Sequence, residues 1–198
     1  RARETRRLAR RALFVACSRY VADRLVDAGV HPSRVRVLHP VLPPDETPLV
    51  PRPSAPRLLV MGQLLRGKGF DLAIDALALL PADHVLDVVG EGPSRGELER
   101  HARRVAPGRV RFRGYLPPER VHEAYDEASV VLVPSRWPEP FGLIGVEAMQ
   151  RARPVVGFAH GGIPEWLEPR QGGALVPPLD AHALAASARA LTADEAAG

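Results

Sequence analysis

Two glutamates, Glu139 and Glu147, stand on either side of a predicted helix start, and their carboxylates are the first candidates for chemistry. The apolar run at 130–133 predicts a buried parallel strand, and the apolar spacing after Gly142 predicts a helix. Backbone N–H groups at a helix N-terminus bind anions, so the amides of Gly142 and Leu143 predict a phosphate site. Carboxylates beside a phosphate would accept hydrogen bonds from neutral hydroxyls, as in a sugar joined by diphosphate to a ribose. Taken singly, either glutamate also fits a solvated surface position.

A second loop, at 62–69, contains the spacing G-x4-G-K and therefore a candidate phosphate-binding cation. Lys68 is the only lysine among 27 lysine and arginine residues, and a compact ammonium beside glycines favours a point-charge contact with phosphate. The same spacing imitates the loop of P-loop nucleotidases. Those loops end in a hydroxyl residue that binds magnesium, whereas this loop ends in Gly69, so a nucleotidase is the weaker alternative.

Strand-like and helix-like patterns alternate along most of the chain and provide the framework for these loops. This alternation predicts an α/β fold with a Rossmann-like, doubly wound parallel sheet. Ligands of such sheets bind at the carboxyl ends of the strands, where both loops lie. The predicted strands cover residues 58–61, 85–89, 110–112, 130–133, 155–156 and 174–176. The predicted helices begin near residues 70, 94, 118, 142, 164 and 180.

The distribution of proline predicts a domain boundary before this sheet. Prolines recur between residues 40 and 56, which predicts a stiff, extended linker with few backbone donors. Before the linker, residues 14–16 and 35–38 predict two strands around a helix that is capped by Ser18. We therefore predict three segments, which are the end of an N-terminal domain at 1–42, the linker at 43–56 and a second domain at 57–198.

Composition excludes several classes of protein and predicts a soluble, cytoplasmic one. No apolar run approaches the ~20 residues that span a bilayer, and the arginine-rich start lacks the apolar core of a signal peptide. A helix at 1–11 would gather arginines on one face, which suits peripheral contact with anionic lipid, although a solvated helix is the favoured explanation. No aromatic residues interleave with these arginines, so we expect no nucleic-acid partner. Cys17, the single cysteine, excludes an internal disulfide and is expected to be a buried, inert thiol.

The stretch around the two glutamates resembles the retaining glycosyltransferases of family 4, which have the two-domain GT-B fold. Glu139 and Glu147 match the E-x7-E pattern of that family, set in the sequences EPFGL and EAM. The resemblance runs from about Phe14 to the end of the chain. It implies that 1–42 closes an acceptor-binding domain, most of which would be missing, and that 57–198 binds a nucleoside-diphosphate sugar.

The resemblance implies roles for the residues around the helix start. Glu139, together with Phe141 and Gly142, would hold the donor sugar, and Glu147 would hold the ribose. The amides of Gly142 and Leu143 would meet the diphosphate.

The sequence departs from the family pattern at two places. The loop at 62–69 usually reads G-R-x-x-x-x-K-G, with both cations on the diphosphate, whereas Gln63 stands at the arginine position here. Lys68 would keep its role on the diphosphate, and Arg66 would supply the second charge. Lys68 and Glu139 would then be the catalytic residues. Arg153 stands where the pattern usually has glycine, in a loop that we expect to be exposed.

Two further loops follow predicted strands and resemble ligand-binding loops of the family. Tyr115 and Leu116 would meet the nucleobase. The motif G-G-x-x-E, made here by Gly161, Gly162 and Glu165, would lie at the edge of the donor.

The resemblance implies a retaining, metal-independent glycosyltransferase, and we expect it to use a UDP- or GDP-linked sugar and no cofactor. Its acceptor would be a carbohydrate, a lipid or a small molecule. The sequence has no D-x-D and no H-E-x-x-H motif, so no metal site is expected. Two alternatives stay open, which are a P-loop-like nucleotidase that uses 62–69 and a non-catalytic nucleotide-sugar-binding module. Transfer normally needs a cleft between two domains, so we expect this chain alone to bind a donor and transfer little.

Overall fold

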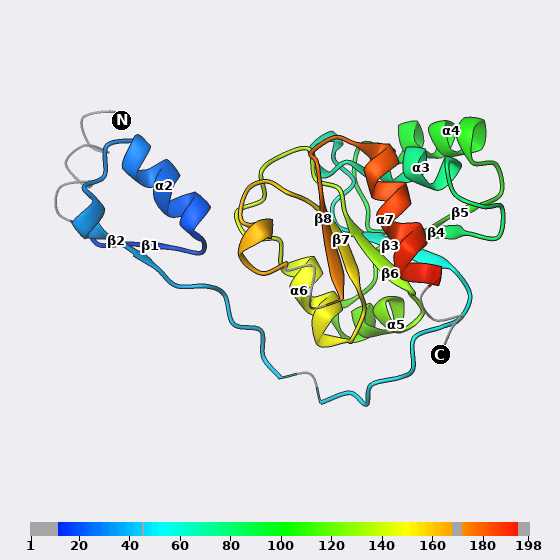
Figure 1. Ribbon diagram of the computed structural model, residues 1–198, viewed down its shortest axis with the longest axis horizontal. Coiled ribbons are helices and arrows are strands. Elements are labelled where there is room, and N and C mark those ends of the chain that lie inside the picture. Colours follow the sequence, from blue (N-terminus) through cyan, green and yellow to red (C-terminus); the bar gives the residue numbers. More distant parts are fainter. Residues whose placement is uncertain (1–11, 45, 168–171, 194–198) are drawn as a thin grey trace.

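The structure is a computed structural model that describes residues 12–44, 46–167 and 172–193. The arginine-rich residues 1–11, on which the expectation of lipid contact rests, lie outside the described residues. A small N-terminal unit and a larger α/β domain are joined by a long segment that has no helix or strand where it is described (Figure 1). Among the described residues, no helix combines the length and the apolar character needed to cross a membrane.

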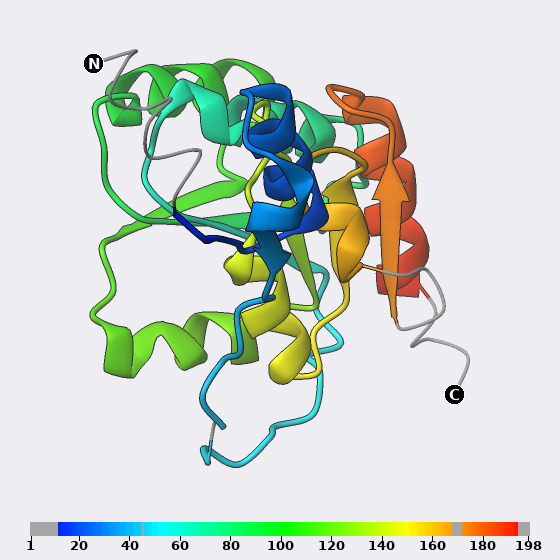
Figure 2. The ribbon, with the colours of Figure 1, turned by 90° about the vertical axis from the view of Figure 1, so that its left-hand side faces the viewer.

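The N-terminal unit is a β-α-β arrangement, as the sequence predicts. Strand β1 (Phe14–Ala16) pairs in parallel with β2 (Val35–Val37), and helix α2 (Arg19–Asp27) lies between them in the chain. The Ser18 hydroxyl oxygen accepts a hydrogen bond from the Val21 N–H at 3.1 Å, which confirms the predicted N-cap. Figure 2, viewed from the side of this unit, shows it in front of the larger domain, with the linker running below.

Where the structure is described, the strands of the larger domain form one parallel sheet of six strands. Their order is β5-β4-β3-β6-β7-β8, so the chain starts at the centre, winds outward to one edge and then returns to build the other half. This is the order of a doubly wound, Rossmann-like sheet, and it confirms the predicted fold class. The strands are β3 (Arg57–Met61), β4 (Val85–Val89), β5 (Val110–Gly114), β6 (Val130–Val133), β7 (Val155–Phe158) and β8 (Gly173–Val176).

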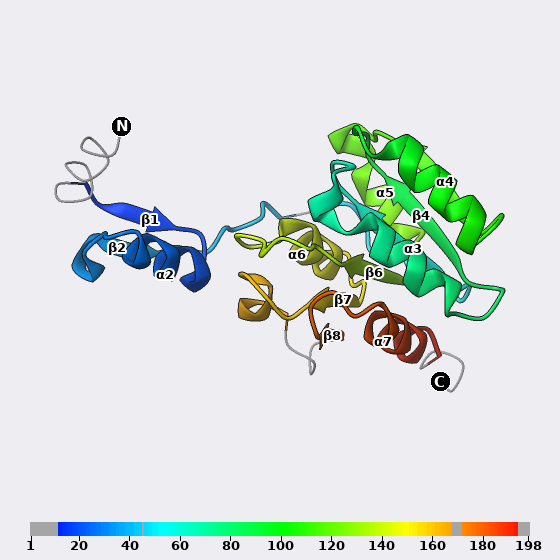
Figure 3. The same ribbon diagram turned by 90° about the horizontal axis from the view of Figure 1, so that it is seen from above.

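Helices cover both faces of this sheet. They are α3 (Phe70–Ala78), α4 (Arg95–Val105), α5 (Val121–Asp126), α6 (Leu143–Gln150) and α7 (Ala181–Ala193). Helices α3, α4 and α7 share one buried apolar cluster on one face, and α3 lies between the other two (Figure 3). Helices α5 and α6 contribute to a second cluster on the opposite face. Because both faces are covered, every residue of β6 and β7 is buried.

Two buried arginines hold the proline-rich linker against the larger domain. Arg151 and Arg153 are each only 2% exposed, and their guanidinium groups donate hydrogen bonds to linker carbonyl oxygens. The expectation of an exposed loop at Arg153 is therefore wrong, because the linker and helix α5 cover this side chain and supply its acceptors. The division of the chain into domains at residues 42 and 57 stays a prediction.

Candidate functional site

Two adjoining cavities lie at the carboxyl edge of the sheet. They have volumes of 1020 Å³ and 410 Å³, and Met61, the last residue of β3, lines both of them. The predicted site residues divide between the two cavities. The larger cavity is lined by Gln63, Tyr115, Leu116 and Glu147, among others. The smaller cavity is lined by Lys68, Glu139, Phe141, Gly142 and Leu143, among others.

In the smaller cavity, Lys68 and Glu139 form an ion pair. The Lys68 ammonium lies 2.7 Å from Glu139 Oε1, and the Ser135 hydroxyl donates to the same oxygen at 2.5 Å. The Lys68 side chain is 29% exposed and the Glu139 side chain 13%, so the pair is partly shielded from water. The predicted phosphate-binding cation and the predicted sugar-binding carboxylate therefore lie within hydrogen-bonding distance of each other. Cys17 also lines this cavity and is partly exposed, so its thiol is not buried as expected.

Glycines allow the close backbone contacts that hold the Glu139 loop. Gly142 is the N-cap of α6 and has a φ of 91°, a left-handed conformation that favours glycine. Gly161 and Gly162 pack against the loop, and a Cβ on Gly161 would come within 2.4 Å of the Glu139 carbonyl oxygen. The Gly162 N–H donates to that carbonyl at 2.8 Å. The two glycines expected at the donor edge therefore support the backbone that presents Glu139.

In the larger cavity, Glu147 of α6 is held by Tyr125 of α5. The Tyr125 hydroxyl donates to Glu147 Oε2 at 2.7 Å, and the tyrosine is 2% exposed. Burial, followed by the negative charge of Glu147, raises the pKa of Tyr125 above its ordinary value of 10.0, so the phenol stays a donor at neutral pH. This bond fixes one carboxylate oxygen of Glu147 and leaves the other to accept hydrogen bonds from a ligand.

Segments from three neighbouring strands complete the larger cavity. Gln63 follows β3, Gly90 follows β4, and Tyr115 and Leu116 follow β5. Parallel strands end at the same edge of a sheet, so the order β5-β4-β3 brings these loops together. Tyr115 is 68% exposed and therefore presents its ring to solvent at the cavity.

Arg66 lines neither of these two cavities, and its expected contact with a diphosphate stays a prediction. A short 3-10 helix, Arg66–Lys68, turns the loop there. Lys68 lines the smaller central cavity, whereas Arg66 lines a separate cavity of 430 Å³ beside α3 and α4. A 3-10 helix has three residues per turn, so side chains two positions apart point in different directions. Of these two cations, Lys68 is therefore the one that points to the smaller cavity beside Glu139.

Glu165 contacts the N-terminal unit. Its carboxylate accepts hydrogen bonds from the N–H groups of Arg19 at 2.8 Å and Tyr20 at 2.9 Å, in the first turn of α2, and lies 3.1 Å from His39 Nε2. Burial by itself raises the pKa of Glu165, but these three contacts outweigh it and lower the pKa below the ordinary value of 4.5. Glu165 therefore caps helix α2, and its expected position at the donor edge stays a prediction.

Comparison with known proteins decides the family. Residues 55–194 match the family described as "Glycosyl transferases group 1". The chain belongs to this family.

Relatives of this glycosyl transferase chain are longer proteins. It is 29% identical to the amylovoran biosynthesis glycosyltransferase AmsK of Erwinia amylovora, over 96% of this chain and 50% of AmsK. It is 34% identical to the glycogen synthase of Mycobacterium tuberculosis, over 74% of this chain and 36% of that enzyme. The chain thus spans half or less of the length of these two relatives.

Solved glycosyltransferase structures share the fold of this chain. Anabaena Alr3699/HepE in complex with UDP-glucose matches it with a TM-score of 0.87 at 25% identity, over 98% of this chain and 58% of that one. Sucrose-phosphate synthase from Thermosynechococcus elongatus matches with a TM-score of 0.76 at 30% identity, over 92% and 49% of the respective chains. These matches confirm the predicted GT-B type of α/β fold.

Ser135 and Tyr125 donate hydrogen bonds to the two glutamates of this glycosyl transferase chain, and the sequence predicts neither contact. Ser135, which bonds Glu139, follows the end of β6 and belongs to the loop that the motif identified, so its place in the loop was a usable signal. Tyr125, which bonds Glu147, lies on a different helix and carries no motif. Only the packing of α5 against α6 brings it to the cavity.

Proposed function

We propose that the whole protein is a retaining glycosyltransferase of family 4 that moves a sugar from a nucleoside-diphosphate sugar to an acceptor. In this proposal residues 57–198 bind the donor, and a preceding domain binds a carbohydrate, lipid or small-molecule acceptor. The observation that carries the proposal is the pair of adjoining cavities, with Lys68 and Glu139 in one and Glu147 in the other. UDP is the first nucleotide to test, because structures of the Anabaena relative contain UDP and UDP-glucose.

The donor would span both cavities. The nucleoside would occupy the larger cavity, where Glu147 would accept hydrogen bonds from the ribose hydroxyls and Tyr115 and Leu116 would lie beside the base. The sugar would occupy the smaller cavity beside Glu139. The diphosphate would lie between them, at the N-terminus of α6, where the amides near Gly142 favour an anion.

Breaking the bond between the anomeric carbon and the diphosphate leaves negative charge on the departing diphosphate. Lys68 and the amides at the start of α6 would stabilise that charge, and such electrostatic stabilisation is usually the largest contribution to catalysis. Glu139 would orient the sugar by accepting hydrogen bonds from its hydroxyls. In our proposal the acceptor attacks from the face that the diphosphate leaves, which retains the anomeric configuration, and neither a metal nor a cofactor takes part.

Titration calorimetry with UDP, GDP, ADP and UDP-glucose tests the donor site, with magnesium and with EDTA. We expect the 198-residue chain to bind UDP weakly and equally in both conditions, and to transfer little sugar. A longer form that contains the preceding domain should transfer sugar. If the chain binds none of these nucleotides, the proposed donor site is refuted. Magnesium-dependent nucleotide hydrolysis would favour the nucleotidase, and binding without transfer by the longer form would favour the non-catalytic module.

A further inference from the structure

The proline-rich linker forms part of the larger cavity. Leu42, Pro43, Pro44 and Thr47 line it, opposite residues that follow the strands of the sheet. The Gln150 side-chain amide donates to the Pro43 carbonyl at 2.8 Å and so ties this wall to the end of α6. These four linker residues therefore contribute a surface to the cavity.

Two buried arginines fix the continuation of this wall at Thr47–Pro51. Arg151 donates to the Thr47 carbonyl at 2.7 Å and to the Pro48 carbonyl at 2.9 Å. Arg153 donates to the Val50 carbonyl at 3.1 Å. Proline has a backbone carbonyl but no backbone N–H, so a proline-rich linker offers more hydrogen-bond acceptors than donors. The guanidinium groups supply the donors for these carbonyls.

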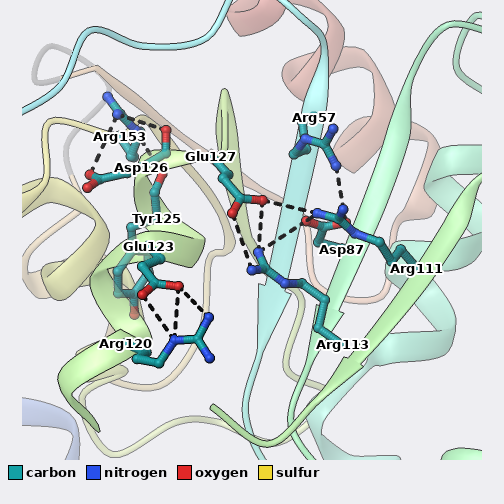
Figure 4. Close-up of polar contacts among 10 residues, drawn as sticks. All are labelled: Arg57, Asp87, Arg111, Arg113, Arg120, Glu123, Tyr125, Asp126, Glu127 and Arg153. Carbon is teal, nitrogen blue, oxygen red and sulfur yellow. Dashed lines mark hydrogen bonds and ion pairs between the residues drawn. The ribbon is translucent and has the colours of Figure 1, made fainter. Parts of the chain in front are cut away.

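Helix α5 connects Arg151 and Arg153 to the rest of the site. Asp126 pairs with Arg151, with both carboxylate oxygens 2.7 Å from Nη2, and its backbone carbonyl accepts from Arg153 at 3.1 Å. Tyr125 accepts from Arg153 Nε through its carbonyl at 2.9 Å, and its hydroxyl bonds Glu147. Figure 4 shows Arg153 beside Asp126 and Tyr125 on one side of the view. A buried guanidinium without partners is costly, so these contacts keep both arginines and the linker in one arrangement.

We infer that the linker residues 42–44 and 47 form a wall of the nucleoside-binding part of the site, and that Arg151 and Arg153 are positioning residues that hold this wall in place. The inference rests on the proposed function. An anchored wall lets a nucleotide bind without ordering a free segment, whereas a loose wall would have to be ordered on binding and would lower the affinity.

Arg153→Met tests the inference most cleanly, because Arg153 is not among the residues that line the cavity and donates hydrogen bonds to carbonyls of the linker and of α5. The milder variant Arg153→Lys keeps the charge and loses the planar fork of donors. Arg111→Met is the matched control. Arg111 belongs to another arginine–carboxylate cluster (Figure 4), and its guanidinium pairs with Asp87 at 2.6 Å and Glu127 at 3.1 Å rather than with linker carbonyls.

The affinities for UDP and for 2′,3′-dideoxy-UDP are measured by calorimetry, well below the unfolding temperature of each variant. We expect Arg153→Met to lower the affinity for both nucleotides by about tenfold and Arg153→Lys to lower it by a smaller factor. The affinities of Arg111→Met should stay within about twofold of those of the unsubstituted chain. We expect the two nucleotides to lose affinity by the same factor, because in this inference the wall contacts the nucleoside but makes no hydrogen bond to its ribose hydroxyls.

Three results would overturn the inference while the proposed function stands. They are affinities within twofold in both Arg153 variants, an equal loss in Arg111→Met, and a loss confined to UDP, which would mean that Arg153 acts through Tyr125 and Glu147. If Arg153→Met does not fold, Arg153→Lys decides. If the original chain binds neither nucleotide, the proposed function itself fails, and the inference fails with it.

Discussion

Replacing Lys68 by alanine is the sharpest test of the site, because this side chain is the cation of its loop that lines the smaller cavity. Its ammonium makes a 2.7 Å contact with Glu139 and is 29% exposed. A hydrogen bond to a charged group contributes about 1.5–3 kcal/mol. In the original protein a diphosphate must compete with Glu139 for the ammonium, so we expect Lys68→Ala to cost near the lower end, about 1.5–2 kcal/mol or 10- to 30-fold in UDP affinity.

Glu139→Gln should act in the opposite direction on nucleotide binding. The substitution removes a negative charge beside the proposed diphosphate and releases Lys68 from its ion pair. We therefore expect UDP affinity to be unchanged or to rise by up to about fivefold, while transfer by a longer form falls. Residues in direct contact are not additive, so Lys68→Ala should cost more in the Glu139→Gln background, about 3 kcal/mol.

Calorimetry with UDP on the two single variants and the double variant gives the coupling directly. Arg66→Ala is the matched control, because it removes a cation two positions away whose side chain lines a different cavity. We expect this control to stay within about twofold of the original. A Lys68→Ala variant that binds UDP as tightly as the Arg66→Ala control would refute the assignment of Lys68 to phosphate. Strict additivity of the two substitutions would show that the ion pair does not compete with the ligand.

Glu147→Gln should weaken the binding of UDP by about 1–2 kcal/mol and the binding of 2′,3′-dideoxy-UDP much less. A carboxylate can accept hydrogen bonds from both ribose hydroxyls, whereas an amide cannot. Tyr125→Phe should show the same ribose dependence with a loss of about 1 kcal/mol, and equal losses for both nucleotides would argue against this role. Glu165 has a lowered pKa, so its stabilising contact with α2 is fully present above the unfolded-state pKa and is lost as the pH falls through the folded-state pKa. The difference in unfolding temperature between the original and Glu165→Gln should therefore shrink between pH 7 and pH 3 in thermal scans, and a constant difference would contradict this.

The sequence by itself determined the architecture of the larger domain, because its signals are local. Apolar runs such as 130–133 are buried on both faces of a parallel sheet, and alternation with helices leaves few other arrangements. The motif from Glu139 to Glu147 likewise gave the helix start and the side chains that line the two cavities, since these residues are neighbours in the chain. Lys68 could be assigned to the same edge because loops after parallel strands meet there.

Only the tertiary structure decided which side chains contact one another across the chain. The sequence predicts a diphosphate contact for both Arg66 and Lys68, whereas a single 3-10 turn sends their side chains to different cavities. Glu165 belongs to a loop motif in the sequence, and only the fold shows that its carboxylate caps the first turn of α2. Arg153 looked like a surface departure from a glycine, yet it is buried because distant linker carbonyls satisfy its donors. Hydrogen bonds of this kind join residues whose separation in the chain follows no period, so no local pattern can reveal them.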